Sequence, residues 1–532
     1  MPLFSLPTEC FSNVLSFLDS QCLYNSLFVN KYWCSLSIPI LWKDPFESIC
    51  MRPKLINTLL SCLNEEEISS LIPYAINVPN NQSPLFEYGK YIRKIRQTFV
   101  EQDIIYWLSI RYYPQDNRVQ KLIDVIYHMI MRQGSNLQEF NIKLYQIDYI
   151  DLPKFSIFTT FRPGITNLRS LKMEKMEKMD VNLKYQDDLI CQNAIEFLTM
   201  VPKFCNKIID CEISVDNLNE IFINPFLNII RSQPLERILI YISRLSNLGG
   251  NTQKILNSLE FRSDTLRELS FEHLNFQRID LSFMTDLEFI EKIKFIHCKG
   301  FISEHCEALS KKKFQFKELK FWHDGFYNIY DMRYDKYSIE LNIVKSIIGC
   351  FCGESLLKLS LNVITMDIIN GIKEYCPNIF FLHILIVSPE PFRDPIIPLI
   401  CDLSSLKILH IQTKSFIFDS GTLAKVLGDF LTSVEYLFFD FFIDLLSFQY
   451  FTKNCKANLK KWIVIPNDNS LRKDYLSCVN NYQKVHNSLK VLGINKLLTF
   501  GWTNEEIEIV DLLKNQGVEV VASEELKFLF DF

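Results

Sequence analysis

The chain has 532 residues, of which 48% are hydrophobic and 22% are charged. This length exceeds one ordinary core and predicts about two to four structural units, and the composition excludes extensive disorder. The net charge of −5 and the pI near 6.0 exclude the basic surplus on which nucleic-acid binding usually depends, so we expect no nucleic-acid partner.

The sequence indicates neither secretion nor membrane insertion. The first ten residues lack a positively charged run followed by an apolar stretch. The most apolar segment, residues 434–448, contains three acidic residues and is too short to span a bilayer. The sixteen cysteines are scattered and include no C-x-x-C pair, which predicts free thiols in a reducing compartment. We therefore expect a cytoplasmic or nuclear protein without a membrane partner.

Residues 6–46 are predicted to form three short helices. The expected N-caps of these helices are Thr8, Asp19 or Ser20, and Asn30. Pro39 is expected to interrupt the third helix, because proline has no amide hydrogen to donate. Helices this short are marginal in water, and roughly forty residues make a poor independent core. The segment is therefore expected to need a partner.

The apolar and polar spacing of this segment resembles the F-box. The residues that carry the resemblance are Leu6, Pro7, Glu9, Val14, Leu18, Leu23, Val29, Lys31, Trp33, Leu41 and Trp42. One departure is Cys22, where many members have aspartate. The resemblance implies binding to a Skp adaptor through Leu6, Pro7, Glu9, Val14, Leu18, Leu23, Val29, Trp33, Leu41 and Trp42. The alternative is that these helices only cap the rest of the fold.

Residues 47–134 are predicted to be a helical connector. Apolar runs near 55–63, 85–95 and 119–131 indicate helices, and three prolines within residues 72–84 indicate a loop. A rigid connector would hold the first segment at a fixed distance from the remainder of the chain.

A short strand-like unit, apolar-x-x-apolar-x-apolar, recurs thirteen times between residue 137 and residue 494. The copies begin at residues 137, 168, 208, 235, 266, 290, 316, 356, 379, 406, 434, 459 and 489. Amphipathic helical runs lie between them. Near the end of the chain, Thr503 and Glu506 are expected to form a capping box at the start of a helix, and Gly517 is expected to end that helix. Residues 518–522 are expected to form a last strand.

Strand and helix at this period resemble the leucine-rich repeat. The resemblance implies an α/β fold in which residues 135–532 form a curved solenoid with a parallel sheet on its concave face. Most copies lack the asparagine or cysteine that the family places after the strand; Cys298 and Asn467 fit that position. The third residues of six successive copies alternate in charge, which is expected of neighbouring parallel strands. These residues are Asp210, Arg237, Glu268, Lys292, Glu318 and Lys358.

Beyond Lys358 the same row becomes apolar, and an exposed patch on the strand face is predicted. It consists of Phe381, His383, Ile408, His410, Tyr436 and Phe438. Aromatic residues gathered on a surface are typical of partner sites, so we expect a target protein to bind here. The alternatives are that residues 526–532 fold over the patch, or that the predicted register is locally wrong.

Catalytic and cofactor motifs are missing. The sequence contains no Gly-rich phosphate loop, nucleophile elbow or H-E-x-x-H motif. The cluster of His297, Cys298, His305 and Cys306 could suggest zinc, but adjacent residues of a strand point to opposite faces, and the repeat explains Cys298 better. Asp187 and Asp188 are interpreted as helix-capping residues. We expect no enzyme, no metal and no cofactor.

Together the two resemblances indicate an F-box/leucine-rich-repeat protein of the type expanded in fungi. They imply a substrate receptor of an SCF-type ubiquitin ligase, with an F-box at 1–46, a connector at 47–134 and the solenoid at 135–532. Its partners would be the Skp adaptor, through it a cullin and a RING subunit, and an unknown target protein. A scaffold outside a cullin complex, or an enzyme with an unrecognised site, are the alternatives.

Overall fold

The computed structural model describes residues 7–523 with several gaps. The gaps are 48–52, 79–83, 110–115, 145–149, 175–190, 215–219, 243–249, 324–342, 344, 352, 363–365, 387–398, 401–402, 414–419, 467–468 and 495–501. Two compact units divide the chain, Met1–Leu266 and Arg267–Phe532. Within the described residues, no helix is both long enough and apolar enough to cross a bilayer.

The first unit begins with helices and continues into parallel strands. Its helical part comprises α1 (Thr8–Leu15), α2 (Ser20–Ser26), α3 (Lys31–Leu41), α4 (Pro53–Leu60), α5 (Glu65–Ser69), the 3-10 turns η2 (Ile72–Tyr74) and η3 (Tyr88–Tyr91), α6 (Gln97–Trp107) and α7 (Asn117–Arg132). Its strands are β1 (Lys94–Arg96), β2 (Glu139–Ile142), β3 (Ser170–Met173), β4 (Asp210–Ser214) and β5 (Arg237–Tyr241). Helices α8 (Phe155–Thr160), α9 (Gln192–Phe204), α10 (Glu220–Ser232) and α11 (Gly250–Asn257), with the turn η5 (Ser258–Arg262), lie between or after these strands.

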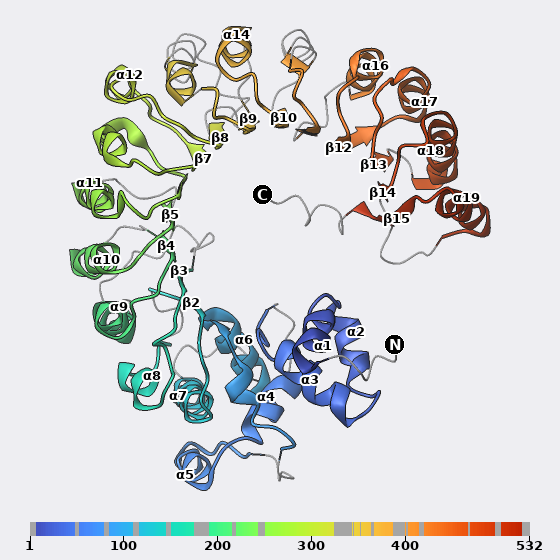
Figure 1. Cartoon of the computed structure of the whole chain (residues 1–532). Helices are drawn as coiled ribbons and strands as arrows, with labels where there is room; N and C mark the ends of the chain where they lie inside the picture. Colours follow the sequence, from blue (N-terminus) through green and yellow to red (C-terminus); the bar gives the residue numbers. More distant parts are fainter. Residues whose placement is uncertain are drawn as a thin grey trace. The chain divides into compact units, whose positions relative to one another are not determined.

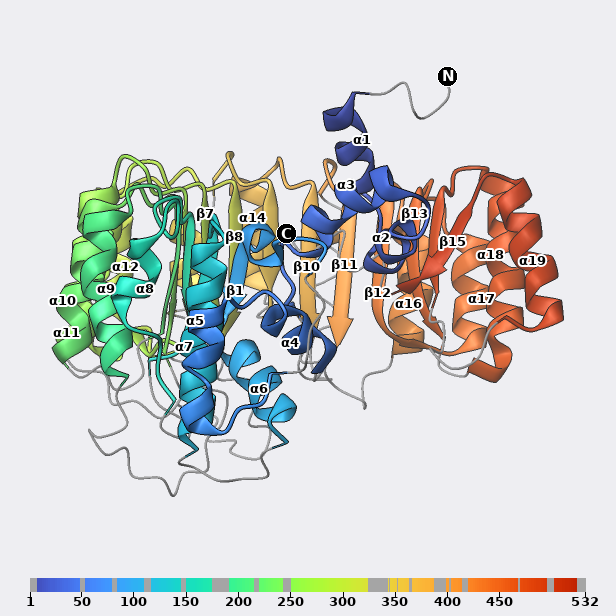
Figure 2. The ribbon, with the colours of Figure 1, turned by 90° about the horizontal axis from the view of Figure 1, so that it is seen from below.

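The second unit repeats a strand followed by a helix or helical turn. Its strands are β6 (Glu268–Glu272), β7 (Lys292–Cys298), β8 (Glu318–His323), β9 (Lys358–Leu361), β10 (Phe381–Ile386), β11 (Ile408–Thr413), β12 (Tyr436–Ile443), β13 (Lys461–Pro466), β14 (Val491–Ile494) and β15 (Glu519–Ala522). Its helices and turns include η6 (Phe276–Arg278), η7 (Ser282–Asp286), α12 (Ser303–Ser310), α14 (Met366–Tyr375), α16 (Ser420–Phe430), α17 (Leu445–Asn454), η9 (Asn469–Leu471), α18 (Arg472–His486) and α19 (Asn504–Asn515). The labelled helices lie on one side of the sheet, and α17, α18 and α19 pack side by side (Figures 1 and 2).

Neighbouring strands pair in chain order, and the pairs described within each unit are all parallel. Side chains of a strand alternate between the face that meets the helices and the opposite face, here called the open face. In β12, for example, Leu437, Phe439 and Ile443 are buried against the helices. The mixed α/β class, the parallel sheet and the thirteen expected strand positions are therefore confirmed.

The sheet begins earlier than the sequence pattern indicates. Strand β1 lies inside the predicted connector and pairs in parallel with β2, Ile95 facing Phe140. Its three residues are too few to display a period of two, so the pattern gave no signal. The compact-unit boundary at Leu266 also falls inside the predicted solenoid.

Local helix signals are mostly confirmed, with two corrections. The side chains of Asp19 and Asn30 cap α2 and α3, and Thr503 forms the capping box with Glu506. The N-cap of α1 is instead Pro7, without a side-chain hydrogen bond, and Thr8 is the first helical residue. Helix α3 continues through Pro39 to Leu41. The carbonyl that Pro39 leaves without its usual donor belongs to Ser35, which is exposed and can be hydrated.

Candidate functional site

The three N-terminal helices share a small hydrophobic core. Phe11, Leu15 and Leu23 are buried, and side chains from α3 and from the connection between α1 and α2 pack around them. Those partly buried side chains are Leu18, Trp33, Leu36, Ile40 and Leu41. The ring of Trp33 meets that of Phe11 edge-on at 4.9 Å. Four of the residues expected to contact an adaptor, Leu18, Leu23, Trp33 and Leu41, thus contribute to the interior of this unit, and direct contact through them stays a prediction.

Another set of apolar side chains stands on the surface of the same helices. Val14 is 47% exposed, Phe17 89%, Tyr24 53%, Phe28 73% and Val29 56%, and we call these five residues the N-terminal patch. Phe17 and Phe28 follow α1 and α2, where the chain turns, and both stay largely exposed, although the ring of Phe28 meets that of Tyr24 edge-on at 5.3 Å. Val14 and Val29 were expected from the sequence, and Pro7 and Glu9 are also exposed.

Phe17, Tyr24 and Phe28 were missed because they stand outside the spacing that carries the family resemblance. The signal that could have found them is the surplus of bulky apolar residues beyond the number needed for three short amphipathic helices. Leu6 lies outside the described residues.

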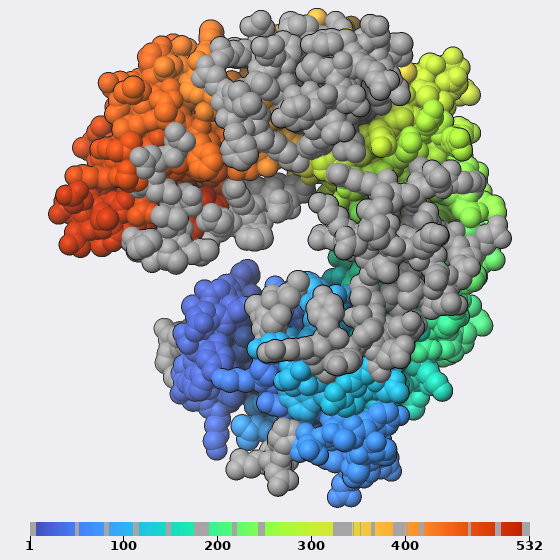
Figure 3. All heavy atoms as spheres, turned by 180° about the vertical axis from the view of Figure 1, so that it is seen from behind, coloured from blue at the N-terminus to red at the C-terminus, as the bar shows by residue number. Residues whose placement is uncertain are grey.

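Trp42 joins the three-helix segment to the next helices and strand of the chain. Its ring lies 4.3 Å from that of Tyr88 in η3. The carbonyl oxygen of Lys43 accepts hydrogen bonds from the amides of Arg93 and Lys94, at 2.9 and 3.1 Å. Trp42, expected to contact an adaptor, therefore packs against η3, and the next residue, Lys43, anchors the segment to the start of β1. The space-filling view shows residues of both segments packed side by side (Figure 3).

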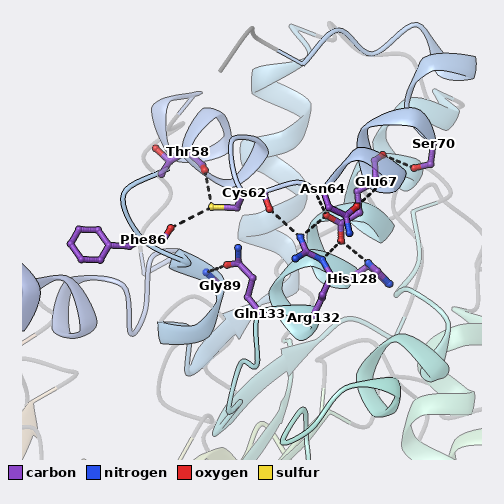
Figure 4. Close-up of polar contacts among 10 residues, drawn as sticks. All are labelled: Thr58, Cys62, Asn64, Glu67, Ser70, Phe86, Gly89, His128, Arg132 and Gln133. Atoms are coloured by element: carbon purple, nitrogen blue, oxygen red, sulfur yellow. Dashed lines mark hydrogen bonds and ion pairs between the residues drawn. The ribbon is translucent and has the colours of Figure 1, made fainter. Parts of the chain in front are cut away.

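A polar network fastens α5 to α7 within the predicted connector (Figure 4). Asn64 and Glu67 form a capping box at the start of α5. The carboxylate of Glu67 also accepts from Arg132 at 2.9 and 2.8 Å and lies 2.7 Å from Nδ1 of His128. The same guanidinium donates to the carbonyl of Cys62 at 3.0 Å. One buried carboxylate thus ties together two helices that are far apart in sequence.

Burial and hydrogen bonding act in opposite directions on Glu67. Burial raises the pKa of its carboxyl, because the charged form loses water. Hydrogen bonds from Arg132, Asn64 and His128 favour the charged form and together hold the pKa below its usual value. Glu67 is therefore a carboxylate at neutral pH, and the network is intact there.

Close packing at Gly89 supports the same junction. The amide of Gly89 donates to Oε1 of Gln133 at 2.7 Å. A side chain at this position would meet that oxygen at 2.8 Å and the Cα of Ile130 at 3.0 Å. A larger residue would have to push both atoms away, so glycine favours the close approach of η3 to the end of α7.

Ion pairs line the open face near the first strands of the sheet. Glu139 lies between Lys94 at 3.3 Å and Lys172 at 3.5 Å, on the neighbouring strands β1 and β3. Beyond the ends of these strands, Lys143 and Glu101 form a buried ion pair at 2.5 Å. Glu174 accepts from the amide and the hydroxyl of Thr98 at the start of α6. Burial raises the pKa of Glu174 to about 7.

The predicted charge row is present in register. Asp210 faces Arg237, and Lys292 faces Glu268 on one side and Glu318 on the other. Glu318 faces Lys358. Lys294, one row further on, lies 2.7 Å from Glu268 and 3.7 Å from Glu318. Charged side chains on neighbouring strands therefore neutralise one another here. The row is best explained as a set of ion pairs that stabilises the sheet.

The six predicted target-binding residues are also in register. Phe381, Ile408 and Tyr436 form one row, and His383, His410 and Phe438 the next. The expected exposure is not found for Phe381, His383 and Phe438, which are 8%, 8% and 4% exposed. Large side chains on strands about 4.8 Å apart cover one another. Ile408, His410 and Tyr436 keep part of their surface exposed, and target binding by these six residues stays a prediction.

His383 is held in a packed polar arrangement. Its ring stacks on His410 with centroids 4.1 Å apart and planes 5° apart. Its Nδ1 lies 3.1 Å from the hydroxyl of Ser360, which accepts from the indole of Trp322 at 3.2 Å. Burial, with smaller contributions from His410 and Lys320, lowers the pKa of His383 well below its usual value. This ring is therefore neutral at physiological pH.

The structure explains His305 and Cys298 without a metal. The two ring nitrogens of His305 lie 3.1 Å from the amide of Ile302 and 2.7 Å from the carbonyl of Ile279. The thiol of Cys298, the residue that fits the repeat's cysteine position, is buried and donates to the carbonyl of Phe271 at 3.5 Å. In the described part of the chain, no three histidine, cysteine or acidic side chains gather as a metal site would require. Asp187, Asp188 and Asn467 lie outside the described residues.

The N-terminal helices are the part of the chain that matches a known protein family. Residues 3–48 match the family model F-box-like. The N-terminal patch and the core beneath it thus belong to an F-box-like domain. No curated protein matches the chain. Among solved structures, the crystal structure of a TLR13–ssRNA13 complex is similar with a TM-score of 0.26 and 12% identity, over 74% of this chain and 62% of that chain. The match thus covers less than two thirds of that protein.

Proposed function

We propose that this protein is the substrate-recognition subunit of an SCF-type ubiquitin ligase. In this proposal, residues 1–46 bind a Skp adaptor, which brings a cullin and a RING subunit. Residues 47–134 connect this segment to residues 135–532, which bind a target protein in the cytoplasm or nucleus. F-box domains generally bind Skp adaptors, and the F-box-like match at residues 3–48 supports the first step.

The N-terminal patch is the observation that carries the proposal. Five bulky apolar side chains, each about half exposed or more, crowd onto a domain of some 46 residues. Two of them, Tyr24 and Phe28, touch with ring centroids 5.3 Å apart, and exposed apolar side chains that adjoin on a small domain are typical of a surface that another protein covers. Aromatic residues such as Phe17, Tyr24 and Phe28 supply large contact areas at such interfaces.

Catalysis in this proposal comes from positioning and not from a residue of this chain. A ligase receptor raises the effective concentration of its target near the conjugating enzyme. The connection therefore has to be stiff. The Glu67–Arg132–His128 network and the close approach at Gly89 supply that stiffness within the first unit.

The deciding experiment is co-purification of the full chain with a Skp adaptor and a cullin. We expect the wild type to retain both and Phe17→Ser/Phe28→Ser to lose both. Phe430→Ser, which changes a phenylalanine that is 52% exposed on α16, is the matched control and is expected to retain both. A folded wild-type protein that binds no adaptor would refute the proposal. Retention of the adaptor without any cullin would instead favour a scaffold outside the ligase.

A further inference from the structure

The open face of the last five strands carries a group of apolar side chains, here called the strand cluster. Phe438 of β12 and Ile463 of β13 lie at its centre and are 4% and 2% exposed. The side chains that pack around these two, each partly exposed, are Ile408, Tyr436, Val491 and Val521. Every strand from β11 to β15 contributes at least one of them, so an apolar surface crosses five strands.

The strand register places the cluster in two neighbouring rows. One row consists of Ile408, Tyr436, Lys461, Val491 and Glu519. The other row consists of His410, Phe438, Ile463, Gly493 and Val521. Charged side chains on this face are thus Lys461 and Glu519 in the first row, and Asp440, two residues beyond Phe438 in β12. The second row contains no acidic or basic side chain between Phe438 and Val521, and it is the apolar centre of the face.

Gly493 interrupts the second row inside β14. It faces Ile463 on one neighbouring strand and Val521 on the other, and it is buried although it has no side chain. A glycine inside a strand commonly marks a place where another stretch of backbone approaches closely. Leu492 and Ile494, which flank it, are buried on the helix side, so the approach at Gly493 is from the open face.

The chain itself supplies a segment of matching chemistry directly after the last strand. β15 ends at Ala522, and residues 524–532 lie outside the described residues. The bulky apolar residues among these nine are Leu526, Phe528, Leu529, Phe530 and Phe532. Nine extended residues reach about 30 Å, whereas the four strand spacings from β15 to β11 amount to about 19 Å. The segment is therefore long enough to cross the whole cluster from the strand that it follows.

We propose that residues 524–532 lie across the open face of β11 to β15 and cover the strand cluster. Because the segment is joined to β15, its effective concentration at the cluster is on the order of millimolar, well above that of a free protein. A target that binds these strands therefore has to displace the segment, which acts as an internal competitor. The contact itself does not depend on the proposed ligase function.

The first test places a photoreactive group in the segment of the full chain, as Phe530→p-benzoylphenylalanine. After irradiation, mass spectrometry of the digested protein identifies the residues to which position 530 is joined. We expect products with open-face residues of β11 to β15. No such product is expected when the same group replaces Phe430, which is 52% exposed on α16. Products only with the helices or with a second copy of the chain, or no product, would overturn the inference.

The second test measures whether the cluster is already occupied in the full chain. A fluorescein-labelled peptide of residues 524–532 is added, and its binding is followed by fluorescence anisotropy. We expect Phe528→Ser/Phe530→Ser/Phe532→Ser to bind the peptide at least about tenfold more tightly than the wild type, whose own segment occupies the cluster. Phe430→Ser is the matched control and should bind as weakly as the wild type. Equal binding by the wild type and the triple variant would contradict the inference.

A leucine side chain at position 493 would fill the space into which the segment approaches. Gly493→Leu, added to the triple variant, is therefore expected to weaken binding of the peptide about tenfold. If this variant does not fold, a peptide with serine in place of its three phenylalanines tests the same contact and should not bind the triple variant. Serine and phenylalanine peptides that bind with equal affinity would refute the apolar contact.

These tests and the adaptor co-purification fail separately. A missing crosslink with adaptor and cullin retained would refute this inference and leave the ligase proposal standing. A crosslink between position 530 and the open face in a protein that binds no adaptor would refute the ligase proposal and leave the covering segment established.

Discussion

Arg132 donates two hydrogen bonds, of 2.9 and 2.8 Å, to the two carboxylate oxygens of Glu67, which precedes it by 65 residues. The Glu67 side chain is 4% exposed and that of Arg132 is 27% exposed. A bidentate pair of this kind is both strong and directional. It connects the short helix α5 to the long helix α7, whose apolar side is buried.

Arg132→Met is expected to destabilise the first unit by about 2–3 kcal/mol, because it leaves the buried carboxylate of Glu67 without its main partner. Hydrogen exchange of α5 and α7, combined with urea unfolding, measures this effect. Lys90→Met, which removes an exposed ion pair with Glu87, is the control and should cost under about 0.5 kcal/mol. Equal losses in the two variants would show that the pair has no special role.

Glu174→Gln is expected to change how stability depends on pH. The folded-state pKa of Glu174 is raised to about 7 by burial, against an ordinary value of 4.5. Its contribution to stability is therefore complete below pH 4.5 and is lost as pH rises through about 7. Because the side chain is only partly buried, we expect about 1–2 kcal/mol. Denaturant unfolding at pH 5 and pH 8 should show a smaller decrease in the variant, and an identical decrease would contradict the assignment.

Leu23→Ala and Phe28→Ser should separate folding from binding in the F-box-like domain. Leu23 is 5% exposed in the core, so its truncation is expected to cost about 2–4 kcal/mol and to reduce adaptor binding only by unfolding the domain. Phe28 is 73% exposed, so its replacement should alter stability by under about 0.5 kcal/mol and still weaken adaptor binding. Thermal unfolding measures the effect of each variant on stability, and an adaptor pull-down measures its effect on binding. Adaptor binding unaffected by Phe28→Ser would exclude that side chain from the interface.

Lys294→Met is expected to destabilise the second unit, because Glu268 and Glu318 would lose the ammonium group that lies 2.7 and 3.7 Å from them. We expect about 1–2 kcal/mol, since Lys292 still lies between the same two carboxylates. Unfolding at low and high salt measures the effect, and the difference from wild type should shrink at high salt. Lys317→Met, at an exposed pair with Glu291, is the control. A larger loss of unfolding free energy in Lys317→Met than in Lys294→Met would show that the Lys294 ion pairs are not the ones that stabilise this unit.

Much of the strand order could be predicted from the sequence. Each expected copy of the repeat places apolar residues such as Leu359 or Leu409 at fixed spacing, and that spacing alone selects the buried face of a strand. The cap at Asn30 and the capping box at Thr503 could also be predicted from the sequence, because each depends on residues within one turn of the helix. Strand β1 could not be predicted, because three residues are too few to show the alternation of apolar and polar residues that marks a strand. Only its pairing with β2 defines it.

From the amino-acid sequence alone we could deduce the class of fold, the order and register of most strands, and the F-box-like character of the first residues. These properties follow from local periodicity and motif spacing. The folded structure was needed to tell which apolar residues lie on the surface and which lie in the core. Leu23 and Phe28 look alike in sequence, yet one fills the interior and the other faces solvent. Burial depends on the neighbours that distant segments supply, as for Glu67 and Arg132, and local spacing does not encode those neighbours.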